Sequence, residues 1–227
     1  TLCAIAGGNT PDEIIKLASE CLSSYTHNEF LHMRGLLENL IGASYDSKGR
    51  SAEAIKRYEE SIRLFNASGR HWEAARPINN IGNIYNDHLQ MPERARGYYE
   101  QALEIVKKYG QPAIMETLLN NIGETYRALD QHPTALEYYH EAEKLSLESE
   151  RHLVLFVCRV NMILSYMIIG DYRKSCHYLR LAQAEIEKHG DAFERYFDIF
   201  RKYAATLFYV IGDFERASEY LNKGSKK

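Results

Sequence analysis

The chain has almost no net charge and no motif that marks an enzyme. Its 28 Lys and Arg and 31 Asp and Glu residues give a formal net charge of −3, so nothing attracts nucleic acid in general. Gly7-Gly8 is not followed by the Lys and Ser or Thr of a phosphate-binding loop, and no Gly-x-Ser-x-Gly motif occurs. The nine histidines show no metal-ligand spacing. We predict no enzyme activity, cofactor, metal site or nucleic-acid partner.

Cysteine and long apolar runs are also scarce. The four cysteines are Cys3, Cys21, Cys158 and Cys176. Their wide spacing indicates reduced thiols and, because residues 1–9 lack a signal-like pattern, predicts a cytoplasmic protein. The most apolar segment, 153–169, contains Arg159, Asn161 and Ser165 and is shorter than the roughly 20 apolar residues of a spanning helix. We predict no membrane span.

The chain does contain an internal repeat of about 40 residues. Residues 79–85 read NNIGNIY, and residues 120–126 read NNIGETY. A small residue three positions before a ring marks four units, and Ile163 takes the small position in another: Gly42 with Tyr45, Gly82 with Tyr85, Gly123 with Tyr126, Ile163 with Tyr166, and Ala205 with Phe208. Self-similarity at this period is typical of stacked supersecondary units that bury a core only together.

Capping signals divide each unit into two helices. Thr10 and Glu13 form a capping box, and Pro11, Pro92 and Pro133 suit first helical positions. No alternating strand pattern is present. We predict an all-α chain whose helices span about residues 10–25, 29–48, 51–68, 71–89, 92–109, 112–129, 133–149, 151–169, 172–189, 191–211 and 214–223. Pro77 should kink the helix that contains it, and Ile163 should make packing in its unit looser or shifted.

The order of small residue, ring, small residue, ring and small residue resembles the tetratricopeptide repeat (TPR) over nearly the whole chain, most closely at 123–142. The resemblance implies a right-handed α-solenoid of antiparallel helix pairs, with about five repeats and a leading half repeat. Residues 1–227 would form a single domain, and the unfinished last unit suggests a fragment of a larger protein. The 40- to 42-residue units exceed the usual 34. This longer form resembles kinesin light chain, Rap-type peptide-sensing regulators, and sensor regions preceding bacterial diguanylate cyclases.

Three asparagines occupy one position in successive units: Asn80, Asn121 and Asn161. Stacked units would place these amides in a row, able to hydrogen-bond the N–H and C=O groups of an extended peptide. This resembles the asparagine ladder of O-linked N-acetylglucosamine transferase and kinesin light chain, which implies a peptide ligand in the concave groove. Helical spacing adds further residues to the same wall: Asn39, Asn79, Asn83, Asn86, Arg76, Glu124 and Arg127. Alternatively, the asparagines only bond the neighbouring helix.

The apolar fourth unit offers a second candidate surface. Val157, Val160, Leu164 and Met167 fall on one side of its first helix by spacing. They form either extra core or a hydrophobic patch for a partner or a homodimer. On the second helices, Glu141 and Glu143 lie between core positions, which predicts a solvated face.

Three functional classes follow. We favour a protein- or peptide-binding module, the sensor or scaffold region of a bacterial signalling protein, with an attached output domain such as a diguanylate cyclase. The second is a Rap-like receptor for a quorum peptide, which regulates a response regulator or a DNA-binding domain. The third, a hydrolase or transferase, has no residue set in its support.

Overall fold

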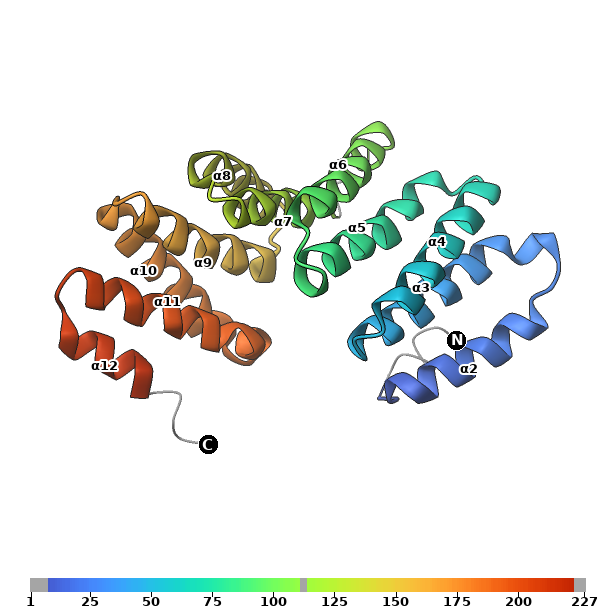
Figure 1. Cartoon of the computed structure of the whole chain (residues 1–227), viewed down its shortest axis with the longest axis horizontal. Helices are drawn as coiled ribbons and strands as arrows, with labels where there is room; N and C mark the ends of the chain where they lie inside the picture. The colour runs from blue at the N-terminus through green and yellow to red at the C-terminus, as the bar shows by residue number, and fades with distance from the viewer. Residues whose placement is uncertain (1–7, 111–113, 223–227) are drawn as a thin grey trace. The chain divides into compact units, whose positions relative to one another are not determined.

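The computed structural model describes residues 8–110 and 114–222, and all regular structure in those ranges is helical (Figure 1). The α-helices in these ranges are α2 (Pro11–Ser24), α3 (Leu31–Ser47), α4 (Ser51–Ala67), α5 (Ala75–Asn83), α6 (Pro92–Lys108), α7 (Met115–Ala128), α8 (His132–Glu148), α9 (His152–Ile168), α10 (Tyr172–His189), α11 (Phe197–Val210) and α12 (Phe214–Asn222). The predicted all-α, TPR-like class is confirmed.

The chain divides into two compact units, residues 1–118 and 119–227, and the division falls within α7. The first unit contains α2 and the pairs α3–α4 and α5–α6. The second contains α8 and the pairs α9–α10 and α11–α12, with most of α7 packed on α8. Whether the two units form the predicted single solenoid domain stays a prediction.

The helix predicted over 71–89 changes type along its length. It begins as a 3-10 helix, His71–Ala74, continues as α5, and ends as a π-helix, Ile84–His88. The predicted kink assumed that Pro77 lies in a helix interior, but Pro77 is the third residue of α5. Backbone N–H groups of a first turn need no partner in their own helix, so proline is tolerated there.

Two further predicted helix starts differ from the structure. A 3-10 helix occupies Gly190–Tyr196, so α11 begins only at Phe197. Another 3-10 turn, Asn28–Phe30, precedes α3. The start predicted at residue 112 lies outside the described residues, as does Cys3.

A left-handed residue ends the first helix of each repeat. These residues are Gly49, Gln90, Asp130, Gly170 and Gly212, with φ between 53° and 83°. The next residue donates its backbone N–H to the carbonyl of the repeat's ring residue at 2.8–2.9 Å: Arg50 to Tyr45, Met91 to Tyr85, Gln131 to Tyr126, Asp171 to Tyr166, and Asp213 to Phe208. In four repeats this is a Schellman ending, which satisfies carbonyls that the helix itself leaves unpaired. In the second repeat, where the helix ends as a π-helix, the bond from Met91 to Tyr85 spans six residues.

Two helices approach closely where a glycine faces a buried tyrosine ring. A Cβ atom added to Gly82 would lie 2.5 Å from Tyr99 Cε1, and one added to Gly123 would lie 2.6 Å from Tyr139 Cε1. Tyr99 and Tyr139 are 2% and 0% exposed. Gly82 and Gly123 therefore mark close helix crossings.

The repeat ring also stacks on a second ring from the following helix. The stacked pairs are Tyr85–Tyr98, Tyr126–Tyr138, Tyr166–Tyr178 and Phe208–Tyr220, with centroids 5.3–5.6 Å apart. In the fourth repeat Ile163 is fully buried, and the residue at the position of Tyr99 and Tyr139 is the smaller Leu179. In this repeat an isoleucine and a leucine therefore take the places of the glycine and the tyrosine ring that pack together in the second and third repeats.

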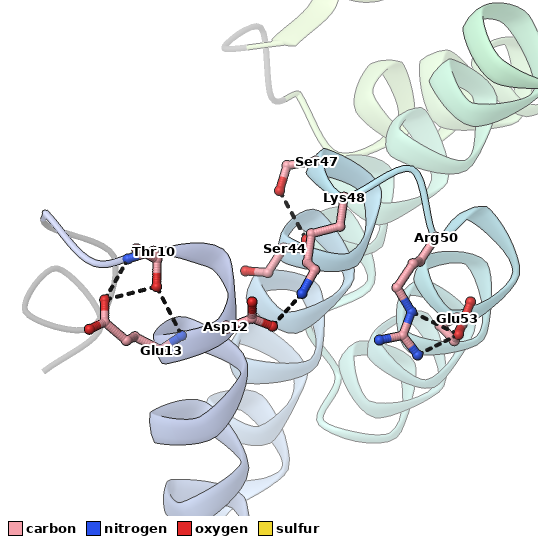
Figure 2. A network of polar contacts seen from close by, with 8 residues as sticks. All are labelled: Thr10, Asp12, Glu13, Ser44, Ser47, Lys48, Arg50 and Glu53. Carbon is pink, nitrogen blue, oxygen red and sulfur yellow. Dashed lines mark hydrogen bonds and ion pairs between the residues drawn. The ribbon is translucent and has the colours of Figure 1, made fainter.

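The predicted capping box at the start of α2 is present (Figure 2). Thr10 Oγ1 accepts the backbone N–H of Glu13 at 3.4 Å, and Glu13 Oε2 accepts the backbone N–H of Thr10 at 2.7 Å. In the same view Asp12 forms an ion pair with Lys48, at the end of α3. These contacts fix the first turn of α2 against the next helix.

Thr10→Ala should destabilise α2 by about 0.5–2 kcal/mol, because it removes the acceptor for an otherwise unpaired N–H. The measurement is amide hydrogen exchange across α2, together with thermal unfolding. Ser19→Ala is the control, since its hydroxyl only bonds the Ile15 carbonyl within the helix. Equal exchange rates in wild type and Thr10→Ala would show that the box does not stabilise α2.

Candidate functional site

In the first unit, the asparagine amides bond one another between neighbouring first helices. Asn80 on α5 donates from Nδ2 to Asn39 Oδ1 on α3 at 3.4 Å, and Asn79 donates to Asn80 Oδ1 at 3.5 Å. Asn83 accepts the Tyr99 hydroxyl at 2.9 Å. Arg76, one helical turn before Asn80, is exposed. The structure thus joins three of the predicted residues, Asn39, Asn79 and Asn80, across α3 and α5.

The second unit repeats this pattern with a more deeply buried amide. Asn161 on α9 donates from Nδ2 to Asn120 Oδ1 on α7 at 3.1 Å and to Glu124 Oε1 at 2.9 Å. Asn120 donates to Asn121 Oδ1 at 3.4 Å. Asn161 is 4% exposed, whereas Asn121 is half-buried. Asn161 therefore makes the helix-to-helix bonds of the alternative interpretation.

A polar cluster surrounds Arg127 in the second unit. We define the Arg127 cluster as Glu124 and Arg127 from α7, Asn161 from α9 and Tyr203 from α11. Burial raises the pKa of Tyr203, and the nearby Arg127 cation opposes this rise. Burial alone would lower the pKa of Arg127, but Tyr139, Glu124 and Tyr203 together raise it. The cluster offers a cation and a carboxylate from α7 and a phenol from α11.

The predicted apolar surface of the fourth unit is divided between core and partly exposed residues. Val160 and Met167 are 3% and 8% exposed, whereas Val157 and Leu164 are half-buried. Buried Val160 and Met167 leave little area for a partner, which favours the core interpretation. The exposed large apolar residues around this unit lie instead at the turn after α9: Ile168, Ile169 and Tyr172.

An ion network between α8, α9 and α10 was not predicted. Arg159 is 7% exposed and donates from Nε to Glu143 Oε1 at 2.9 Å and from Nη1 to Glu185 Oε1 at 3.0 Å. The prediction of a solvated Glu143 is wrong, because its side chain is 13% exposed and faces Arg159. Burial alone would raise the pKa of Glu143, but hydrogen bonds from His140 and Arg159 outweigh it and hold the pKa below its ordinary value.

Two histidines meet Glu185 beside this network. The possible ligand atoms of His152, Glu185 and His189 all lie within 4.8 Å of one another. One feature of the sequence could have pointed to this cluster. Glu185 and His189 have the i, i+4 spacing that places two residues on one helix face. His152 is 33 positions earlier than Glu185, so only the α9–α10 pairing joins the three.

Three described cysteines, Cys21, Cys158 and Cys176, carry free thiols. Among the helices that the structure describes, none has the length and hydropathy needed to cross a bilayer.

Repeated helix pairs, ring-on-glycine packing and linked first-helix asparagines define a TPR-like helical repeat protein. Solved structures of this fold include kinesin light chain and Rap proteins. The family model described as "Soluble NSF attachment protein, SNAP" matches residues 41–197. The match spans more than half of the chain, so the chain belongs to the SNAP family.

Individual relatives share the fold at low identity or share a short segment. "Response regulator aspartate phosphatase A" of Bacillus subtilis (strain 168) is 38% identical over 59 residues, 26% of this chain and 15% of that protein. BtubC (BKLC) from P. vanneervenii has a TM-score of 0.77 at 15% identity, over 96% of this chain and 91% of that one. NprR in complex with its cognate peptide NprX has a TM-score of 0.70 at 17% identity, over 94% and 60%.

Proposed function

We propose that this chain is a binding module that holds an extended peptide or partner segment on the first helices of its repeats, with the Arg127 cluster as the main recognition site. The observation that carries the proposal is this cluster. Glu124, Arg127 and Tyr203 bring three kinds of polar group together on half-buried positions of the second unit. A partly desolvated cation binds a polar ligand more strongly than one in water.

The asparagines divide into two roles in this proposal. Asn161 and Asn120, both 4% exposed, hold α7 and α9 together. Asn80 and Asn121, which are half-buried, supply amides toward peptide backbone, as do Asn39, Asn79 and Asn83. Arg76 and Arg127 select side chains or a carboxylate. The structure of NprR with its cognate peptide supports peptide binding on this fold.

The role in the cell takes one of two forms. One is the sensor or scaffold region of a signalling protein with an output domain such as a diguanylate cyclase. The other is a Rap-like peptide receptor acting on a response regulator or DNA-binding domain. Similarity to a response regulator aspartate phosphatase over 59 residues favours the second form. In either form we place the chain in the cytoplasm, as a binder and not an enzyme.

Arg127→Gln should weaken binding of a peptide selected by display on the whole chain. Loss of a hydrogen bond to a charged group costs about 1.5–3 kcal/mol, which is about 10- to 150-fold in affinity. Calorimetric titration measures this, with melting temperatures compared beforehand. Arg180→Gln is the matched control, since Arg180 is exposed on the second helix α10 of the same unit.

Unchanged affinity in Arg127→Gln would contradict the proposed recognition site. If Arg180→Gln weakened binding instead, the ligand would lie on the second helices. Either result would require a different binding surface.

A further inference from the structure

We propose that His152, Glu185 and His189 bind a divalent transition-metal ion, with zinc as the best fit. His152 is the first residue of α9, while Glu185 and His189 lie in the last turns of α10. Two imidazoles and one carboxylate form a known type of zinc-ligand set. This site is separate from the peptide face and does not depend on it.

The distances suit a small tetrahedral ion. Ligand atoms about 2.0–2.1 Å from tetrahedral zinc lie about 3.3–3.4 Å from one another. His152 Nδ1 lies 3.4 Å from Glu185 Oε2, and His189 Nε2 lies 3.8 Å from the same oxygen. The two imidazole rings stack with centroids 4.2 Å apart. Small ring movements would bring all three atoms to one ion.

Two of the ligand atoms lack other hydrogen bonds. Within the described residues, His152 Nδ1 and Glu185 Oε2 are buried and make none. Glu185 as a whole is 6% exposed. A buried polar atom without a hydrogen bond costs free energy, so a bound cation would stabilise this arrangement.

Arg159 orients the carboxylate without blocking it. It donates to Glu185 Oε1, which leaves Oε2 facing the histidines. Arg159 also pairs with Glu143, so two carboxylates surround one guanidinium and the buried group has a net charge of −1 when the histidines are neutral. This charge favours a dication. Outer partners that fix a ligand in this way are usual at metal sites.

The histidines leave the site accessible. Their side chains are 43% exposed at His152 and 33% exposed at His189. An ion can therefore enter, and water or a further ligand can take the fourth position, as in open zinc sites. A bound ion would connect the start of α9 to the end of α10.

Cobalt(II) titration of the purified, chelator-treated chain tests the site, followed by competition with zinc. We expect one equivalent bound, an absorption spectrum of tetrahedral cobalt without sulfur ligands, and a higher melting temperature with zinc. His152→Gln and His189→Gln should each weaken binding by at least about 10- to 100-fold, the loss typical when even an outer partner is removed. His71→Ala is the control, because His71 is exposed in the other unit and pairs with Asn66.

Three results would overturn the proposal. They are no cobalt binding at an excess over protein, a sulfur-to-cobalt charge-transfer band that assigns binding to a cysteine, and unchanged binding in a folded His152→Gln. His152→Gln keeps the test informative if His189→Gln unfolds, since His152 is the more exposed of the two.

Discussion

Arg159→Leu should lower the free energy of unfolding by about 3–5 kcal/mol, the typical cost of removing one partner from a buried ion pair. Glu143 and Glu185 would lose the guanidinium between them while their side chains remain 13% and 8% exposed. Leucine cannot replace either hydrogen bond. Chemical denaturation of wild type and variant measures the difference.

The matched control for this change is Arg63→Leu. Arg63 pairs with Glu60 on the exposed face of α4, where its side chain is 62% exposed. Exposed ion pairs contribute little to stability, so unfolding should barely change. If Arg159→Leu behaved like Arg63→Leu, the Arg159 network would not be buried in solution.

The loss in the free energy of unfolding caused by Arg159→Leu should be smaller at acidic pH. In the wild type the lowered pKa of Glu143 stabilises the fold above the unfolded-state pKa, and this contribution is lost as the pH falls through the folded-state pKa. In the variant, burial without Arg159 favours a higher pKa of Glu143, so ionisation of Glu143 costs stability and its protonation relieves that cost. The difference between the two proteins should therefore be larger near pH 7 than near pH 5. A deficit independent of pH would indicate lost packing and not lost ion pairing.

The repeat could be predicted from sequence because its determinants are local. Gly82 and Tyr85 are three residues apart, and the same spacing recurs at Gly123 and Tyr126. This recurring spacing predicts the helices and also the faces on which they pack closely. The changes from 3-10 helix to α-helix were not predicted. The 3-10 segments His71–Ala74 and Gly190–Tyr196 depend on how one repeat joins the next.

The polar networks could be predicted only in part. Repeat register aligned Asn161 with Asn121, but it could not show that Asn161 bonds the preceding residue, Asn120, at 3.1 Å. Arg159 finds partners 16 and 26 positions away, on two different helices. Periodicity marks a helix face as apolar or polar, but it does not show which buried charges meet. For the same reason, periodicity did not predict that His152 lies beside Glu185.

Gly82→Leu should destabilise the first unit by about 1–3 kcal/mol or more, the cost of overpacking a filled core. Even the first added atom would lie 2.5 Å from Tyr99 Cε1 and 2.7 Å from Tyr99 Cδ1. The ring has little room to move, because it is 2% exposed and its hydroxyl donates to Asn83 Oδ1 at 2.9 Å. Thermal and chemical unfolding measure the loss, and circular dichroism should still report a helical protein.

Gly97→Ala is the matched control for overpacking at Gly82. Gly97 lies on the exposed face of α6, and a Cβ atom added there meets no heavy atom within 4 Å. Alanine should therefore stabilise the helix by about 0.5–1 kcal/mol, because glycine loses more backbone freedom on folding. Comparing the two substitutions therefore separates the cost of overpacking a close helix contact from the effect of backbone entropy on stability. If both substitutions changed stability equally, the ring-on-glycine contact would not determine how α5 packs on α6.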